Sequence, residues 1–400
     1  MRGGYAAGTF MSSGTDLTTM ERPSRPLVLI GLIAIHVGIA GLLLVRSEQL
    51  FGSDGVVRYS EISSRAGTPY RDFEVEFAPA DVLVIEVAAS ADIVTTYRRI
   101  VALMLVVDLA CATAIAYGWG WRAATLYLLL TVPILLIIYL GTDLIWVMLA
   151  TLAFALIDRG HERVGGSTLA LAMLGKVWPI VLIPLLVVTR RKQALGAFLF
   201  VGLVGVALWV VVGGTDAPRQ VLTFRGAQGW EFESLIGALV WIIGRRPAAL
   251  DRGAPRVGAI SPTDRVVLLG VVAAGLWFAG RRARTWRGDI AGVPALASVA
   301  ILLCVSPVFS LEYAPWLIPW AAIAATEDPG ATYAVAVAAI EAATGLLAIL
   351  YVGFAAESLS KVLLILRNGL CLAISAAWLI GMPKRAFRDL DPVQDGQSRR

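Results

Sequence analysis

The chain has 400 residues, of which 58% are hydrophobic and 16% are charged, and its formal net charge at pH 7 is +5. Its mean hydropathy is +0.76. A soluble globular protein is close to half apolar and a quarter charged, so this composition excludes a secreted globular enzyme, a disordered chain and a DNA-binding domain. It predicts a polytopic membrane protein, in which basic residues mark cytoplasmic loops rather than a surface for nucleic acid.

The chain is expected to begin with a disordered cytoplasmic segment, residues 1–25, which is polar and rich in Gly, Ser and Thr. The first apolar run, Leu27–Val45, is too long for the core of a signal peptide and has no obvious cleavage site. We therefore expect an uncleaved first transmembrane helix. The cysteines, Cys111, Cys304 and Cys371, all lie in apolar stretches and are predicted to be small core residues.

The fold class predicted from the apolar stretches is an all-α polytopic membrane protein with about ten full transmembrane helices and two short half-helices. The half-helices are expected within 167–189, where Lys176 and the pair Trp178-Pro179 interrupt an apolar run. The full spans are expected near 27–45, 98–118, 122–140, 143–157, 194–213, 264–280, 290–306, 313–326, 331–354 and 361–381.

The distribution of Lys and Arg predicts the topology. The basic residues Arg190, Arg191 and Lys192 face the cytoplasm only if 167–189 enters and leaves on the same side, so we expect a hairpin there. The membrane domain is then 26–382, with outer segments at 46–97 and 214–263 and a cytoplasmic tail at 383–400. This predicts a multi-pass protein of the plasma (inner) membrane with both termini in the cytoplasm.

The second outer segment contains a short apolar run, Leu235–Ile243, with Trp230 and Trp241 near its ends. It is too short to cross a bilayer and is predicted to be an interfacial helix on the outer face. Two elaborated outer segments on one membrane protein indicate an active site that faces outward.

Several chemistries have no sequence signal. There is no Walker P-loop and no GxGxxG after a strand, and the two histidines, His36 and His161, do not join a cluster of metal ligands. Both are expected to be structural. We expect no metal and no resident cofactor.

An acidic and aromatic stretch in the first outer segment is the strongest local signal for chemistry. Residues 68–79 read TPYRDFEVEFAP. If this stretch is extended, Asp72, Glu74 and Glu76 share one face, and such a carboxylate suits a general base that deprotonates a hydroxyl. The alternative is a solvated acidic loop without a catalytic role.

Four ionisable residues fall within predicted spans: Asp108, Lys176, Glu341 and Arg367. Such residues are costly in lipid and are functional candidates by default. The alternative is structural pairing, of Asp108 with Lys176 or of Glu341 with Arg367. Asp143, at the start of a span, is expected to be an N-cap.

Taken together, four segments resemble glycosyltransferase family 87, membrane enzymes of the GT-C fold. Residues 70–79, YRDFEVEFAP, are similar to its Y-x-D-F-x-x-E-Y-P-P loop, and 141–144, GTDL, to the start of its G-Q/N-x-N/D-L-L span. Residues 174–179, LGKVWP, followed by Pro184 and Arg190-Arg191, resemble its K-x-x-P…P…R-R element. Residues 306–319, SPVFSLEYAPWLIP, resemble its S-P-Q-Y-x-x-W-L-x-P element.

The resemblance implies an inverting glycosyltransferase that moves a sugar, mannose first, from a polyprenyl-phosphate donor to a glycolipid or lipoglycan acceptor on the outer face. It implies that Asp72 is the catalytic base, and it adds a set of substrate-binding candidates. That set comprises Arg71, Glu74, Glu76, Lys176, Arg225, Glu312 and Tyr313. Arg245 and Arg246 are further candidates for the leaving phosphate.

The chain departs from the family pattern at Phe77-Ala78, at Val308 in place of Gln, and at Glu312. These departures indicate a divergent member, so the sugar and acceptor stay open. The leading alternative is a transporter or flippase of a polar or lipid-linked solute, which would use the intramembrane charges. A further alternative is a structural membrane subunit.

Overall fold

The chain forms a bundle of helices, as a computed structural model shows for residues 25–49, 54–244, 248–327, 330–353 and 357–381. The prediction of an all-α polytopic membrane protein is confirmed at this level, since only a small three-stranded sheet interrupts the helices of these residues. The first 24 residues, the tail from 382, and Arg245 and Arg246 lie outside the described residues.

The helices are, in chain order, α1 (Arg25–Val45), α2 (Asp54–Ser64), α3 (Pro79–Ala88), α4 (Ile93–Trp119), α5 (Trp121–Thr131), α6 (Leu135–Ile138), α7 (Asp143–Asp158), α8 (Glu162–Gly175), α9 (Ile183–Val188), α10 (Lys192–Gly213), α11 (Ala217–Leu222), α12 (Leu235–Gly244), α13 (Pro262–Ala283), α14 (Val293–Val305), α15 (Ile318–Ala324), α16 (Gly330–Gly353) and α17 (Glu357–Ile380). Four 3-10 turns join or precede them: η1 (Ser47–Gln49), η2 (Val132–Ile134), η3 (Trp178–Leu182) and η4 (Leu311–Leu317).

Seven stretches of the described chain are long and apolar enough to cross a membrane: Pro26–Val45, Ile93–Trp119, Trp121–Ile138, Lys192–Gly213, Pro262–Ala283, Gly330–Tyr351 and Ser358–Ile380. The other expected spans correspond to α7, α14 and α15. With 16, 13 and 7 residues in their α-helices, these are shorter than the roughly 20 residues of a straight crossing.

The segment around Lys176 is a re-entrant hairpin. Arg191, between α9 and α10, lies 3.6 Å from Asp158 and 3.2 Å from Glu162, which flank the turn between α7 and α8. Both ends of 162–188 therefore lie at the same end of the bundle, as the expected hairpin requires. The half-helices were expected within 167–189, but the first of them, α8, already begins at Glu162 and is therefore longer than expected.

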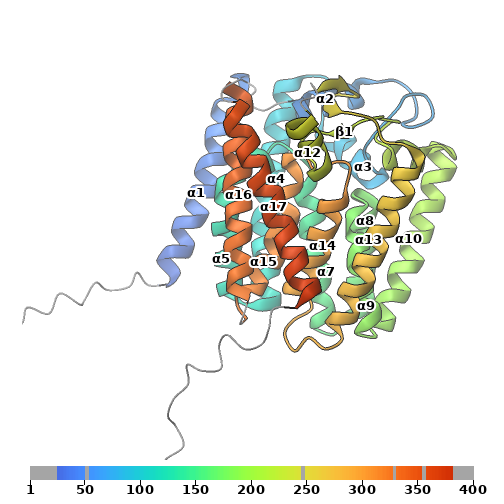
Figure 1. Ribbon diagram of the computed structural model, residues 1–400. Helices are drawn as coiled ribbons and strands as arrows, with labels where there is room; N and C mark the ends of the chain where they lie inside the picture. The colour runs from blue at the N-terminus through green and yellow to red at the C-terminus, as the bar shows by residue number, and fades with distance from the viewer. Residues whose placement is uncertain (1–24, 50–53, 245–247, 328–329, 354–356, 382–400) are drawn as a thin grey trace, which may run out of the picture.

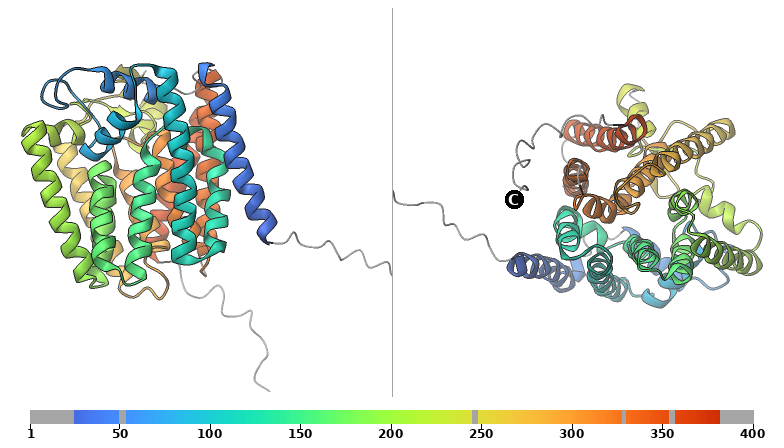
Figure 2. Two further views of the ribbon diagram at one scale, coloured as in Figure 1. Left: turned by 180° about the vertical axis from the view of Figure 1, so that it is seen from behind. Right: turned by 90° about the horizontal axis from the view of Figure 1, so that it is seen from below.

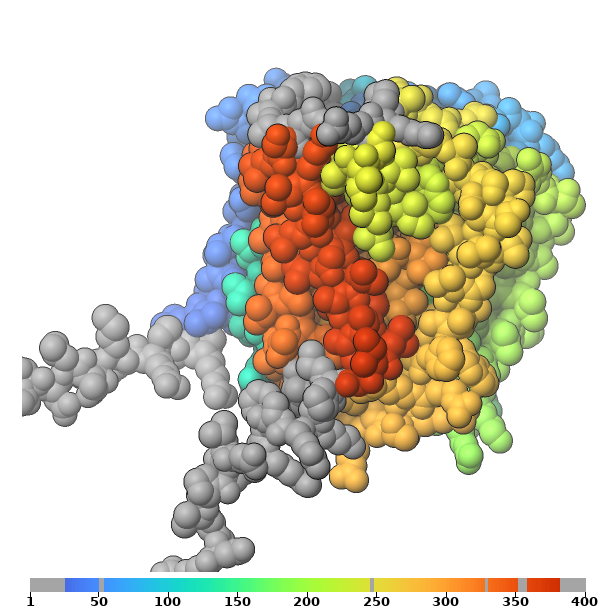
Figure 3. Space-filling model, in the orientation of Figure 1, coloured from blue at the N-terminus to red at the C-terminus, as the bar shows by residue number. Residues whose placement is uncertain are grey.

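The two segments that are predicted to face outward, for which we keep the name outer segments, lie at one end of the bundle, opposite the start of α1 and the end of α17 (Figure 1). The first contains α2 and α3. The second contains α11, α12 and the antiparallel sheet of β1 (Trp230–Glu231), β3 (Ala254–Val257) and β2 (Ala249–Asp251), in that spatial order. The expected short helix is present as α12, which is seated between the upper parts of α17 and α13 (Figure 3).

Local sequence explains where several helices begin. Ser261 and Asp264 form a reciprocal capping box at the start of α13, with Pro262 in its first turn. Asp92 accepts a hydrogen bond from the Thr95 backbone N–H at 2.9 Å and starts α4. Asp143 was expected to be an N-cap, but the cap is Thr142 and Asp143 lies in the first turn, where its carboxylate is free to contact other segments.

Close helix packing depends on small residues in the hairpin. A Cβ added at Gly166 in α8 would lie 2.0 Å from the Ala194 carbonyl oxygen of α10. Only glycine allows the two backbones to approach this closely, a packing mode common between membrane helices. Figure 2 shows these helices nearly end on, side by side in the bundle.

The predicted pairing of Asp108 with Lys176 is wrong, because Asp108 pairs with His36. His36 Nδ1 lies 2.5 Å from Asp108 Oδ2, and Nε2 lies 3.0 Å from the Leu128 carbonyl oxygen. Tyr127 and Tyr139 donate to the same carboxylate at 2.8 and 2.9 Å. Both ring nitrogens of His36 face acceptors, so the site suits the charged imidazolium. His36 was expected to be structural, and its contact with Asp108 joins α1 to α4.

The other predicted pair, Glu341 with Arg367, does not form an ion pair in the described part of the chain. Arg367 is buried and donates to the backbone oxygens of Glu233 and Phe309, and its nearest carboxylate is Glu233, at 3.9 Å. Both carboxylate oxygens of Glu341 are buried without a hydrogen bond among the described residues. The cysteines are buried and unpaired, as expected.

His36→Ala is expected to lower the free energy of unfolding by about 3–5 kcal/mol, because it leaves the buried Asp108 carboxylate without its cation. Thermal and denaturant unfolding in detergent measure this change. Val37→Ala, at an exposed position of the same helix, is the matched control and is expected to change stability little. Equal effects of the two substitutions would contradict the pairing.

Candidate active site

Lys176 lies at the tip of the re-entrant hairpin and is surrounded by carboxylates. Its Nζ is 3.2 Å from Asp143 Oδ2 and 3.7 Å from Asp81 Oδ2. Trp146 donates to Asp81 Oδ1 and Trp316 donates to Asp143 Oδ1, both at 3.0 Å. We call Lys176, Asp81, Asp143 and the nearby Glu312 the lysine cluster. It joins the hairpin to α3, α7 and η4.

Aromatic rings form one wall of this cluster. Tyr313 stacks on Trp316 with ring centroids 4.3 Å apart, and Trp316 stacks on Trp178 at 5.2 Å. Tyr313 is the half-buried member, whereas both tryptophans are buried. Phe77 places its ring 5.4 Å from the Lys176 ammonium. A charged group beside stacked aromatic faces is an arrangement that binds polar ligands with flat apolar patches.

The carboxyl groups of the cluster differ in accessibility. Asp81 is fully buried, and burial raises its pKa to about 6, although the Lys176 charge opposes this shift. Glu312 is half-buried and lies outside the candidate spans. Burial and the Asp143 charge raise the pKa of Glu312 to about 7. The Glu312 carboxyl makes no hydrogen bond or ion pair with another described residue.

The loop that carries Asp72 is a tight turn around Tyr70 and not an extended strand. Tyr70 has φ of 70°, a strained value for a residue with a large side chain. The Tyr70 hydroxyl donates a hydrogen bond to the Phe77 carbonyl oxygen at 2.7 Å. The backbone carbonyl oxygen of Tyr70 accepts a hydrogen bond from Gln220 Nε2, also at 2.7 Å. Gln220 also accepts from the Val75 N–H at 3.1 Å. These bonds hold the strained turn against α11.

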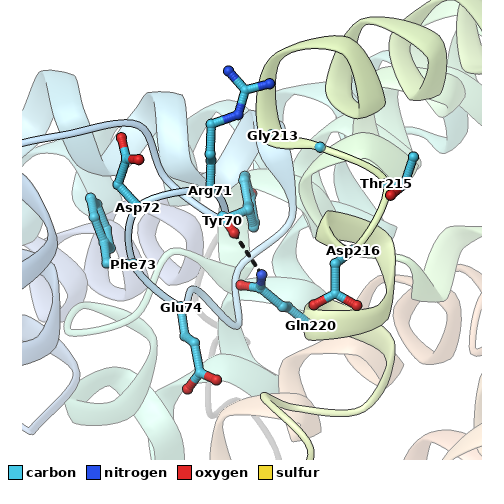
Figure 4. Close-up of a pocket in the computed structure, with 10 residues that line it drawn as sticks. Tyr70, Arg71, Asp72, Phe73, Glu74, Gly213, Thr215, Asp216 and Gln220 are labelled. Carbon is cyan, nitrogen blue, oxygen red and sulfur yellow. Dashed lines mark hydrogen bonds between the residues drawn. The ribbon is translucent and has the colours of Figure 1, made fainter.

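Asp72 is exposed at the edge of an open pocket of 490 Å³. Its Oδ2 accepts from the Thr68 N–H at 2.6 Å, and Gly67, with φ of 108°, leaves room for that carboxylate. Figure 4 shows Arg71 and Asp72 on one side of the loop and Glu74 on the other. The remaining walls are Tyr70, Phe73, Gly213, Gly214, Thr215, Asp216 and Gln220.

The other two acids of the loop bind arginines, so the three carboxylates do not share one face as expected. Glu76 lies 2.9 Å from Arg58 and 3.2 Å from Arg225, and Glu74 lies 2.7 Å from Arg252. These ion pairs tie the first outer segment to the second. Arg71 is exposed and makes no ion pair within the described part of the chain.

The structure thus divides the sequence-derived candidates between two places. Lys176, Glu312 and Tyr313 meet in the lysine cluster, while Arg71, Asp72 and Glu74 line the open pocket. Glu76 and Arg225 lie in the ion-pair network between the outer segments. The sequence reasoning missed Asp81 as a member of the site, because Asp81 and Glu86 both lie in the helix after Pro79 and nothing in the sequence separates them.

No protein-family model matches the chain, and a search of curated proteins finds no match. Among the described residues, no group of three or more His, Cys, Asp or Glu side chains is arranged to hold a metal ion.

Glu312→Gln is expected to gain thermal stability relative to the wild type as pH rises from about 4.5 to about 7. A carboxyl group with a raised pKa favours the folded state while it is protonated, and that contribution is lost as pH rises through its folded pKa. Glutamine cannot ionise, so the difference between the two proteins should grow across this interval.

Thermal unfolding in detergent at several pH values measures the difference. Glu86→Gln, at an exposed position of α3, is the control and should differ from wild type by a constant amount. A difference for Glu312→Gln that does not change with pH would contradict the expectation.

Proposed function

We propose that this protein is an inverting membrane glycosyltransferase with a GT-C-like fold and ten crossings. It would move a sugar, mannose as the first candidate, from a polyprenyl-phosphate donor to a lipid or lipoglycan acceptor. The reaction would take place at the outer face of the plasma membrane. The observation that carries the proposal is the open pocket in which an exposed acid, Asp72, neighbours an exposed guanidinium, Arg71.

The position of this pocket suits an amphiphilic substrate. Gly213 and Gly214 line it at the end of α10, and that helix exposes large apolar side chains such as Leu208, Val211 and Val212 just before the pocket. A lipid tail can lie along such a face while its polar head reaches the pocket. This continuity of an apolar helix face with a charged pocket supports a lipid-linked substrate.

In the proposed reaction, the hydroxyl oxygen of the acceptor forms a bond to the anomeric carbon of the donor sugar. The bond from that carbon to the phosphate oxygen breaks, and its electron pair stays on the phosphate. Asp72 takes the hydroxyl proton, and Arg71 stabilises the charge on the departing polyprenyl phosphate. A β-linked donor would give an α-linked product.

The other basic candidates are less available for the phosphate. Arg225 is held by Glu76, and Lys176 is already balanced by Asp143 and Asp81. Arg71 is the candidate in this set that makes no ion pair with a described residue. This difference supports Arg71 as the partner of the leaving phosphate.

The transporter hypothesis receives less support. It relied on the intramembrane charges, but Asp108 belongs to the His36 cluster, Lys176 to the lysine cluster, and Arg367 to a third group with Glu233. Charges that belong to separate clusters do not favour a single polar path through the bundle.

Asp72→Asn is expected to lower the rate of sugar transfer by about 10²–10⁴-fold, the usual contribution of a general base. Asparagine keeps an oxygen that can accept from the Thr68 N–H, so the turn should persist and the loss should report on proton transfer. Transfer from polyprenyl-phosphomannose in isolated membranes measures the rate.

Glu48→Gln, which removes an exposed acid from the same outer segment, is the matched control and should retain activity. Full activity of Asp72→Asn would remove Asp72 from the mechanism. Absence of transfer in the wild type with every lipid-phosphate sugar would contradict the proposed function itself.

A further inference from the structure

The lysine cluster contains polar atoms whose hydrogen-bonding capacity is not used within the described chain. Thr142, which precedes Asp143 of the cluster, has a buried hydroxyl that makes no hydrogen bond, and Asp81 Oδ2 makes none either, although it faces the Lys176 ammonium at 3.7 Å. Asp81 and Thr142 are themselves completely buried. Burying a polar atom without a partner is costly, so such atoms usually face water or a ligand.

The side of the cluster next to Glu312 is accessible. Lys176 keeps 15% of its side chain exposed, and Glu312 and Tyr313 are half-buried. Glu312 adds a carboxylate that has no partner among the described residues, and Tyr313 is the most exposed ring of the aromatic stack with Trp316 and Trp178. Acceptors, an ammonium donor and an aromatic face therefore converge on one accessible spot.

We infer that the accessible side of the lysine cluster is a binding subsite for a neutral sugar ring, with Glu312 accepting its hydroxyl hydrogens and Tyr313 covering one face. This inference rests on the proposed function, because it assigns the sugar of the lipid-phosphate donor to this subsite. A hexose fits the chemistry because its hydroxyl groups both donate and accept, while its C–H face packs on an aromatic ring.

The charge of the cluster argues against a phosphate at the same place. Three carboxyl groups surround one ammonium, and Lys176 already contacts two of them. An anion here would meet repulsion from Glu312 and Asp143, whereas a neutral polyol would not. The phosphate of the donor therefore lies outside the subsite, and only its sugar enters.

The test compares two probes, a short-chain prenyl-phosphomannose and the same prenyl phosphate without sugar, by equilibrium binding to the detergent-solubilised protein. The dissociation constant of prenyl phosphate divided by that of prenyl-phosphomannose measures the contribution of the sugar to binding. Glu312→Gln, which weakens a hydrogen bond to a charged group, and Tyr313→Ala, which removes the ring that covers the sugar, are each expected to reduce this ratio by about tenfold, while prenyl phosphate binds as before.

Tyr313→Phe keeps the ring and is the matched control, which should retain the ratio. Glu312→Asp, which keeps the charge but shortens the side chain, is a second variant and should also reduce it. Thermal unfolding of each protein confirms that it is folded.

The outcomes separate this inference from the proposed function. If the wild type binds both probes equally, or if the ratio is unchanged in folded Glu312→Gln and Tyr313→Ala, the sugar subsite is rejected and the donor class stands. If the wild type binds neither probe, the proposed donor class is rejected and the subsite falls with it.

Discussion

The contact of Lys176 with Asp143 and Asp81 is the interaction on which the rest of the structure depends. A lysine at the tip of a hairpin inside a membrane bundle is costly unless a carboxylate neutralises it. Here the carboxylates come from the start of α7 and from α3, which lie far apart in the sequence. The charge of Lys176 therefore holds the tip of the hairpin next to the start of α7 and next to α3 of the first outer segment.

A second set of ion pairs, outside the bundle, turns two long segments into one surface. Arg58 and Arg225 hold Glu76, and Arg252 holds Glu74, so the loop of Asp72 is clamped between α2 and the second outer segment. The Arg252–Glu74 pair is exposed and contributes little by itself, whereas the two pairs of Glu76 are largely covered. The strained turn at Tyr70 is held by its hydrogen bonds to Phe77 and Gln220 and by its ring contact with Trp209, which gives the open pocket a fixed wall.

Hydropathy and charge were sufficient to predict the helical membrane fold, the hairpin near Lys176 and the short helix α12, because each depends on local composition. Pairing between distant segments could not be predicted this way. His36 was expected to be a packed histidine, and nothing in its local sequence indicates that Asp108, 72 positions later, lies beside it. The sequence pattern also suggested that Asp72, Glu74 and Glu76 share a face, but the left-handed conformation of Tyr70 turns the chain between 69 and 73. Asp81 was overlooked because its role becomes visible only when Lys176 and Trp146 are placed around it.

The arginines of the outer segments and the acids of the lysine cluster have a joint electrostatic consequence. Arg58, Arg71, Arg225 and Arg252 all belong to the segments at the outer end, and the loop that they surround leads, through Phe77, to the acid-rich cluster. Glu74 and Glu76 compensate three of these arginines, so Arg71 is the one of the four that has no ion pair among the described residues. Under the proposed function, the anionic end of a ligand would turn towards Arg71 and its neutral end towards the lysine cluster, so electrostatics would favour one orientation of the ligand.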